Sequence, residues 1–378
     1  MRTLGLYIHI PFCQQKCNYC DFYSFSATDK AKEDYINALC THIEMEADCY
    51  EDCEFDTVYI GGGTPSILDP LLIERLGLAI KKHLKLTQGA EFSIEINPGT
   101  LTEEKLHSYK KIGVNRLSIG LQSTDDKLLF MLGRIHSLKD FEASYYLARK
   151  NGFDNISLDL MYSLPNQTKE DFLRTLKKAI SYKPEHISAY CLKIEENTQF
   201  GKIKDILVLP NEDEEYETYL DLVDTLEKNG YSQYEISNFS KEGRRSRHNM
   251  KYWLSHEYVA LGPSAHSYFN GKRYSYNPSV QEYVDSIQNG ISPKKQFEEE
   301  NRYSLSKMDE YVMLRMRLSD GVSCEEFKGL FGKNLLCEYP RLEEFVAQGY
   351  VSCKNGAYSF TPKGFFVSNY ILTEILSF

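Results

Sequence analysis

The sequence predicts an α/β protein, in which a partial (β/α)6 TIM-like barrel, open on one side, is followed by a smaller α+β domain. Strand-like and helical segments alternate six times between residues 4 and 192, as they do in parallel βαβ units. This alternation fades after residue 193. Beyond about residue 301, three helical segments precede a hairpin, which is the order of elements in a winged-helix domain.

Length and composition indicate a soluble globular protein of two or three domains. The chain has 378 residues, of which 42% are hydrophobic and 26% are charged. A net charge of −10 argues against a nucleic-acid binder, which normally has a basic face. No apolar run is long enough to span a bilayer and no signal segment is recognised, so we expect a cytoplasmic protein whose ten cysteines are reduced.

Alternation of apolar residues and the positions of turn residues place the elements of the barrel. The first strand is predicted over residues 4–12 and the first helix over residues 30–50. Further strands are predicted at 55–60, 91–96, 116–119, 156–161 and 186–192. Further helices are predicted at 70–84, 102–111, within 125–151, and at 169–182.

Three cysteines, Cys13, Cys17 and Cys20, follow the first strand with the spacing C-x3-C-x2-C. Such a loop can bind three irons of one [4Fe–4S] cluster and leaves the fourth iron without a protein ligand, whereas four cysteines are the usual set. Zinc is an alternative, but closed zinc sites usually have two separated ligand pairs, and no second pair follows. A third interpretation is three buried free cysteines. The remaining seven show no convincing ligand set: Cys40, Cys49, Cys53, Cys191, Cys324, Cys337 and Cys353.

Polar residues and glycines follow several predicted strands, at the end of a barrel where functional residues lie. The triple glycine after the second strand allows close approach of a ligand to the backbone, although a flexible turn is the alternative. Glu95 ends the third strand in an apolar setting, where a structural salt bridge is the alternative. Arg134 can bind a carboxylate with two hydrogen bonds. The residues of this predicted rim are Gly62, Gly63, Thr64, Glu95, Gln122, Arg134 and Asp159.

The cysteine motif, with Tyr19 before its last cysteine, resembles the signature of the radical S-adenosylmethionine (SAM) superfamily. In that superfamily SAM chelates the open iron, and one-electron reduction cleaves it to a 5′-deoxyadenosyl radical. The string from Tyr7 to Cys13, YIHIPFC, narrows the resemblance to the branch of oxygen-independent coproporphyrinogen III oxidase and the HemW heme chaperones. The resemblance implies Cys13, Cys17 and Cys20 as cluster ligands, and SAM contacts from Tyr7, Tyr19, Gly62, Gly63, Thr64, Glu95, Gln122, Arg134 and Asp159.

Residues 201–300 contain a second group of motifs. An acidic run at 211–215 predicts the solvated start of a helix, and the Tyr-rich segment 231–239 predicts a strand. His248 lies among aromatic residues and is a candidate axial ligand of heme iron, with a hydrogen-bonded packing role as the alternative. Its surroundings resemble the H-N-x-x-Y-W signature of the HemW group, which favours the ligand. His266 either lines a substrate face or caps a turn.

The last segment predicts a winged-helix fold, with helices at 308–318, 323–331 and 339–348 before a hairpin at 350–361. In isolation this fold suggests DNA binding, but Lys and Arg are not concentrated here. The resemblance implies a cap domain instead. We therefore expect three units: a barrel over 1–200, an extension over 201–300 that carries the His248 motif, and a winged-helix-like domain over 301–378.

The resemblance leaves several functions to weigh. The first is a heme chaperone that binds a [4Fe–4S] cluster, SAM and heme and delivers heme to apo-proteins such as respiratory enzymes. The second is coproporphyrinogen III oxidase. Two features of the oxidase differ from this chain: it carries a further cysteine at the position of Phe22, and it has an N-terminal extension before the first strand, whereas here the first strand is predicted from residue 4. The third is an enzyme that opens or methylates the heme ring. A winged-helix regulator that senses iron–sulfur status is the fourth, disfavoured by the acidic charge and the complete SAM rim.

Partners follow from the first function. The chain is expected to bind heme or a porphyrin and apo-hemoproteins as acceptors, and to associate with a membrane only peripherally, through an acceptor. A flavodoxin-type electron donor is expected if SAM is cleaved. No nucleic acid is expected, and the protein is a monomer or a homodimer.

Overall fold

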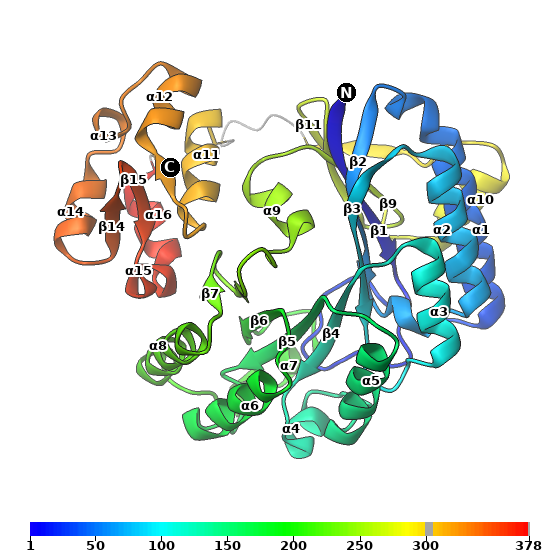
Figure 1. Ribbon diagram of the computed structural model, residues 1–378, viewed down its shortest axis with the longest axis horizontal. Coiled ribbons are helices and arrows are strands. Elements are labelled where there is room, and N and C mark those ends of the chain that lie inside the picture. Colours follow the sequence, from blue (N-terminus) through cyan, green and yellow to red (C-terminus); the bar gives the residue numbers. More distant parts are fainter. Residues whose placement is uncertain (299–304, 377–378) are drawn as a thin grey trace.

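Six parallel strands form the centre of the molecule, and the predicted α/β class is confirmed (Figure 1). The computed structural model describes residues 1–298 and 305–376. The strands are hydrogen-bonded in the order of the sequence, as in a barrel that does not close. They are β1 (Arg2–Ile10), β2 (Cys53–Gly62), β3 (Leu86–Ile96), β4 (Arg116–Gln122), β5 (Ile156–Tyr162) and β6 (His186–Cys191).

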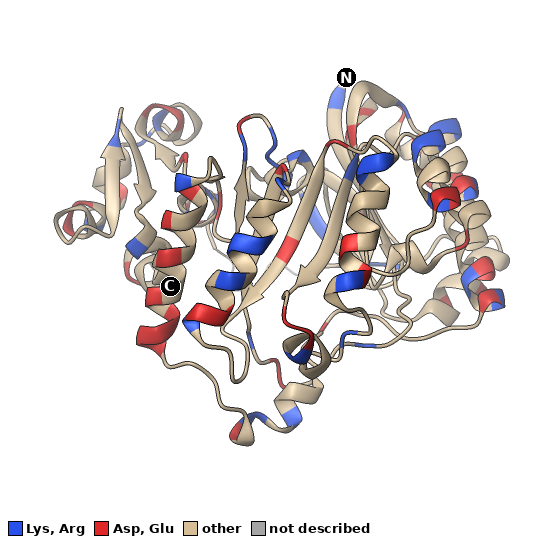
Figure 2. Ribbon diagram, turned by 60° about the horizontal axis from the view of Figure 1, so that its bottom comes forward, with Lys and Arg blue, Asp and Glu red and all other residues tan. Residues whose placement is uncertain are grey.

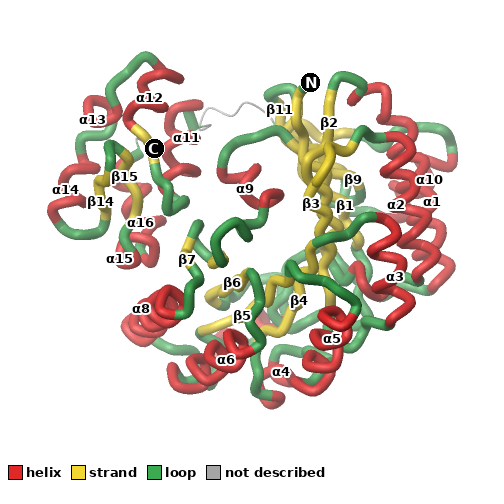
Figure 3. Tube along the Cα trace, in the orientation of Figure 1, coloured by secondary structure: helices red, strands yellow, loops and turns green. Residues whose placement is uncertain are grey.

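Helices follow these strands and cover the outer face of the sheet (Figure 3). They are α1 (Asp29–Glu46), α2 (Pro70–His83), α3 (Glu103–Ile112), α4 (Asp126–Met131), α5 (Leu138–Lys150) and α6 (Lys169–Ser181). Short 3-10 helices lie at Ala47–Tyr50, Pro65–Ile67 and Lys204–Ile206. Every residue of β4 is buried, as expected of a central parallel strand covered on both faces.

The sheet extends beyond both ends of the barrel. Next to β1 lie β9 (Tyr258–Leu261), β10 (His266–Phe269), β11 (Lys272–Tyr276) and β12 (Lys295–Phe297). Next to β6 lie β8 (Asn238–Ser240) and β7 (Ser232–Gln233). The prediction of one strand over 231–239 is therefore wrong. The backbone N–H of Tyr234 donates to the carbonyl of Asn238 (3.0 Å), and the chain turns back instead of continuing.

The extension also contributes α7 (Gln199–Lys202), α8 (Glu212–Lys228), α9 (Arg247–Trp253) and α10 (Val280–Gln288). The predicted helix start at the acidic run is confirmed, because Asn211 caps α8 in a capping box with Glu214. Figure 1 shows α9 between the two ends of the open barrel. Glu91 accepts from the backbone N–H groups of Arg247 and His248 (3.0 Å each) and so anchors the start of α9 to β3.

The C-terminal unit is separate from the barrel sheet and has a three-stranded sheet of its own. Its strands are β13 (Val322–Ser323), β14 (Val351–Lys354) and β15 (Ala357–Phe360), in the order β13-β15-β14. Its helices are α11 (Lys307–Met316), α12 (Cys324–Phe331), α13 (Leu335–Glu338), α14 (Arg341–Ala347), α15 (Pro362–Phe366) and α16 (Ser368–Ile375). The three helices and the hairpin were predicted; α13, α15 and α16 were not.

On most surface helices Lys and Arg are interspersed with Asp and Glu, whereas the first turn of α8 is entirely acidic (Figure 2). The C-terminal unit is joined to the extension by an ion pair between Arg245 and Asp320 (2.6 Å) and by a bridge between Glu235 and Leu318. None of the helices in residues 1–298 and 305–376 has both the length and the apolar character that crossing a bilayer requires.

Candidate functional site

The loop that carries the three cysteines leaves the barrel at the carboxyl end of β1. Two backbone hydrogen bonds close its base, from Cys13 N to Phe25 O (2.9 Å) and from Phe25 N to Pro11 O (3.0 Å). Cys13 is buried, and Cys17 and Cys20 are half-buried. All three line one cavity of about 560 Å³, which we call the cluster cavity. The loop therefore presents three sulfur atoms to a single space.

The cluster cavity also contains most of the predicted SAM rim. Of the predicted residues, it is lined by Cys13, Cys17, Tyr19, Cys20, Gly62, Gly63, Thr64, Glu95, Gln122, Arg134 and Asp159. Tyr7 and His248 do not line it. The carboxyl-terminal parts of β1 to β5, and the loops that follow them, thus bring residues from six separate stretches of sequence to one site, as the barrel geometry requires.

The glycine loop after β2 packs directly against the cysteine loop. Gly63 N donates to Ile10 O and Thr64 N donates to Phe12 O (2.8 Å each). A Cβ on Gly63 would lie 2.7 Å from Phe12 O and 3.0 Å from Cys13 Sγ, so only glycine fits. Thr64 Oγ1 donates to Cys13 Sγ at 3.4 Å. The triple glycine is therefore a contact surface for the cysteine loop, and the interpretation as a flexible turn is wrong.

Two hydrogen bonds hold the Glu95 carboxylate in the wall of the cluster cavity. Its carboxylate accepts from Tyr59 OH and from Gly62 N–H, both at 2.9 Å. Burial raises the pKa of Glu95 to about 7, and these two hydrogen bonds only partly oppose that shift. No cationic side chain forms a salt bridge with Glu95 among the described residues. Its carboxylate can therefore receive a ligand's ammonium or hydroxyl groups.

Arg134 links the rim to the cysteine loop. Its Nη1 donates to Cys17 Sγ (3.6 Å), and its Nη2 donates to Gly120 O (3.0 Å) and contacts Asn97 Oδ1. Burial raises the pKa of Tyr19, and the positive charge of Arg134 opposes this shift only in part. A guanidinium next to thiolates stabilises their negative charge. Arg134 therefore has two tasks here, to hold the loop and to offer positive charge to the cavity.

Gln122 and Asp159 complete the rim from β4 and β5. Gln122 has φ of +63°, a left-handed conformation that is uncommon outside glycine, at a bulge in the pairing of β4 with β5. Asp159 accepts from Ser118 Oγ at 3.0 and 3.2 Å, and burial raises its pKa. The bulge changes the direction of the strand at its end, so that Gln122 lines the cavity.

Several residues that line the cluster cavity were not predicted. They are Tyr59, Asn97, Arg116, Ser118, Ser188, Tyr190 and Asn249, among others. A signal for two of them exists in the sequence, because side chains at every second position of a strand share one face. Arg116 and Ser118 lie at every second position before Gly120 and Gln122, so they are expected on the same face of β4 as the predicted Gln122. Arg116 is 2% exposed, and its Nε has no hydrogen-bond partner among the described residues.

His248 lies on α9 and is 1% exposed. Its Nδ1 hydrogen-bonds with Thr57 Oγ1 (2.9 Å) and its Nε2 with Tyr252 OH (2.8 Å). Burial lowers the pKa of His248 to about 3, so the ring is neutral. Gly5 on β1 permits α9 to pack here, since a Cβ on Gly5 would lie 2.8 Å from Lys251 Cδ and 3.3 Å from the His248 ring. Both ring nitrogens are thus engaged, and the ring lines neither of the two cavities described in this section.

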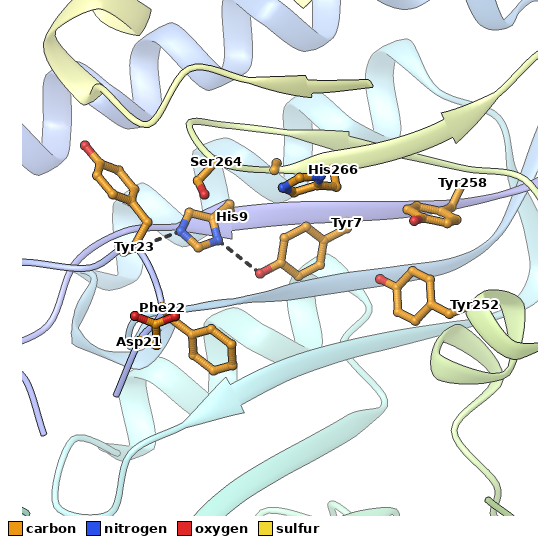
Figure 4. A pocket seen from close by; sticks show the side chains of 10 residues that line it. Tyr7, His9, Asp21, Phe22, Tyr23, Tyr252, Tyr258, Ser264 and His266 are labelled. Carbon is orange, nitrogen blue, oxygen red and sulfur yellow. Dashed lines mark hydrogen bonds between the residues drawn. The ribbon is translucent and has the colours of Figure 1, made fainter. Parts of the chain in front are cut away.

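A second cavity, of about 360 Å³, lies beside the cluster cavity (Figure 4). We call it the aromatic cavity; it is lined by Tyr7, His9, Asp21, Phe22, Tyr23, Tyr252, Tyr258, Ser264, Ala265 and His266. Asp21 and Phe22 line both cavities, and Phe22 is 68% exposed. Tyr7, predicted to contact SAM, is placed here, with its OH 3.1 Å from His9 Nδ1.

The chemistry of the donor set fits a [4Fe–4S] cluster with one open iron. Three thiols face one cavity, a threonine hydroxyl and a guanidinium contact two of them, and Gly63 leaves room beside Cys13. Within residues 1–298 and 305–376, no three His, Cys, Asp or Glu side chains are grouped closely enough to hold one metal ion. The ligands of a cubane bind different irons and need not converge on one point.

The chain matches two protein-family models and is similar over almost its whole length to known proteins. Residues 7–179 match the family model of the radical SAM superfamily, and residues 305–367 match the HemN C-terminal domain. The heme chaperone HemW of Bacillus subtilis is 36% identical, with 98% of both chains covered. That of Lactococcus lactis is 35% identical (98% and 96% covered), and that of Escherichia coli is 34% identical (99% and 98% covered).

Among solved structures, coproporphyrinogen III oxidase (HemN) from Escherichia coli, described as a radical SAM enzyme, is similar with a TM-score of 0.85. The match covers 100% of this chain and 90% of that chain, at 20% identity. At this identity the likeness extends to the fold, including the partial barrel and the C-terminal unit, and not to the reaction.

Proposed function

We propose that this chain, which belongs to the HemW family of heme chaperones within the radical SAM superfamily, binds heme and delivers it to apo-proteins such as respiratory enzymes. The observation that carries the proposal is similarity over almost the whole of both chains. The three HemW relatives named above are covered to 96–98% of their length at 34–36% identity. This similarity includes the extension and the C-terminal unit as well as the barrel.

The cluster cavity supports the assignment of the two cofactors that the superfamily implies. We assign Cys13, Cys17 and Cys20 as the ligands of a [4Fe–4S] cluster. The rim residues of the cavity surround the space where SAM would meet the open iron, and Glu95 and Arg134 offer complementary charges for its amino and carboxylate groups. When bound, these groups supply one-electron chemistry; the residues of the chain orient SAM and shield it from water.

The aromatic cavity supports the assignment of heme. Its walls carry four tyrosines, a phenylalanine and two histidines, a composition suited to a flat conjugated macrocycle that contains iron. We assign residues 1–200 to the cluster and SAM. The wall that faces heme is shared between residues 1–200, which contribute Tyr7 to Tyr23, and residues 201–300, which contribute Tyr252 to His266. We assign residues 301–378 to the acceptor side. In this arrangement heme lies next to Phe22 and thus next to the cluster loop.

Anaerobically reconstituted protein tests the proposal, with heme and with coproporphyrinogen III as separate ligands. We expect stable heme binding, transfer of heme to a heme-free cytochrome, and no decarboxylated porphyrin in the presence of SAM and reductant. SAM-dependent decarboxylation would identify an oxidase instead. Absence of both heme binding and decarboxylation would refute the proposal and leave a radical SAM protein with another substrate.

A further inference from the structure

Three histidines are candidates for the heme ligand, and two of them are already engaged. His248 hydrogen-bonds through both ring nitrogens and is buried behind Tyr252, so it does not line the aromatic cavity. His9 lines the aromatic cavity, but its Nε2 donates to the carbonyl of Tyr23 (3.0 Å). Its Nδ1 therefore accepts from Tyr7 OH (3.1 Å). Neither ring has a free nitrogen lone pair to offer to iron unless existing bonds break.

His266 differs from both. It lines the aromatic cavity from the first position of β10, and its side chain is exposed to that space. None of the hydrogen bonds found in residues 1–298 and 305–376 involves its ring, so both nitrogens are available. Imidazole is a common axial ligand of heme iron.

The turn before β10 fixes the position of His266. Gly262 has φ of +109° and Ser264 has φ of +61°, so the backbone reverses sharply between β9 and β10. A Cβ on Gly262 would lie 2.5 Å from Tyr35 OH, which itself donates to His9 O (2.6 Å). The turn is thus packed against the end of β1. His266 is held over a rigid base rather than on a free loop.

The other walls of the cavity suit a planar ligand. Tyr252 and Tyr258 form an edge-to-face pair with ring centroids 4.6 Å apart. Phe22 extends from the cluster loop and lines both cavities, so its exposed ring is placed to contact a ligand in the aromatic cavity. Figure 4 shows Phe22, Tyr252 and Tyr258 arriving from the cluster loop, α9 and β9, respectively. His248 contributes indirectly, because it holds the hydroxyl of Tyr252.

We propose that the aromatic cavity binds heme with His266 as the axial ligand of the iron, and that His248 is a positioning residue that orients Tyr252. This assignment rests on the proposed function, since it names the ligand for the cargo. It differs from the expectation drawn from the H-N-x-x-Y-W string. In this assignment the H-N-x-x-Y-W motif contributes Tyr252 to the wall of the heme site, and its His248 does not bind the iron.

The test compares His266→Gly, His248→Ala and a matched control, His256→Gly, whose histidine is exposed and lines neither cavity. Each variant is titrated with ferric heme, and the axial ligand is read from the absorption and electron paramagnetic resonance spectra. For His266→Gly we expect loss of the imidazole-ligated spectrum, at least tenfold weaker heme binding, and recovery of the spectrum when free imidazole is added. His248→Ala should bind heme a few-fold more weakly with the wild-type spectrum, and His256→Gly should be unchanged.

Two outcomes would overturn the assignment while leaving the chaperone function intact. One is a His266→Gly protein that keeps wild-type affinity and spectrum, and the other is a His248→Ala protein that alone loses the imidazole signature. Cluster absorbance and thermal unfolding of each variant show whether the fold is retained. A wild-type protein that binds no heme would instead refute the proposed function, and the two failures are therefore distinguishable.

Discussion

The carboxyl group of Glu95 predicts how SAM binding depends on pH. A ligand that meets Glu95 with an ammonium or with ribose hydroxyls prefers the ionised carboxylate. Burial raises the pKa of Glu95 to about 7, against about 4.5 for an unperturbed glutamate. The fraction of protein able to bind SAM therefore falls as the pH is lowered through 7.

The size of this effect follows from the pKa. The ionised fraction is about nine-tenths at pH 8 and about one-tenth at pH 6, so the affinity for SAM should fall about tenfold between them. The linked effect on the ligand-free protein has the opposite sign. Because the pKa is raised in the folded state, ionisation costs stability, with the cost beginning near pH 4.5 and complete above about pH 7. The rise in pKa from about 4.5 to about 7 corresponds to about 3 kcal/mol. This value is an upper bound on the cost, because the carboxylate faces a cavity open to water.

The assay is equilibrium binding of SAM to anaerobic protein with matched cluster content, in wild type and in Glu95→Gln, at pH 6, 7 and 8. The amino group of SAM also titrates, but it does so equally in both proteins, so the difference between the two profiles reports Glu95. Glu103→Gln, at an exposed position on α3, is the control. Parallel profiles in wild type and Glu95→Gln would refute the reasoning. Denaturant unfolding of the ligand-free proteins at pH 8 should show Glu95→Gln to be the more stable.

Three further substitutions test the contacts around the cluster. Cys17→Ala should abolish the visible absorbance of the reconstituted cluster, and survival of that absorbance would contradict the ligand assignment. Gly63→Ala should reduce cluster content, because the added methyl meets Phe12 O and Cys13 Sγ, whereas Gly329→Ala, with open space around it, should not. Arg134→Lys should keep the cluster and weaken SAM binding about tenfold, the cost of one lost charge-assisted hydrogen bond, and unchanged SAM affinity would remove Arg134 from the SAM contacts.

The barrel could be predicted from the sequence because each of its units carries its own local signal. Alternating strands and capped helices such as α5, which begins at Ser137 with a capping box, are set by residues close in sequence. The segment 231–239 was predicted wrongly because its Tyr-rich pattern favours a strand, while Asn238 and Glu235 form local hydrogen bonds that reverse the chain. Local competition of this kind does not appear in the period of the hydrophobic residues.

The site could be predicted only as far as residues follow the ends of strands. Glu95 lies near the carboxyl end of β3, and Asp159 lies on β5, which is separated from β3 by β4 in the same parallel sheet; the fold alone therefore brings both to one cavity. The direction of the His248 side chain depends instead on where α9 enters the open barrel, which is set by Glu91 on β3 and by the absence of a side chain at Gly5. Both lie more than 150 positions away in the sequence. A motif on a short helix specifies which residues are present, but the partners across the barrel decide which of them face the ligand.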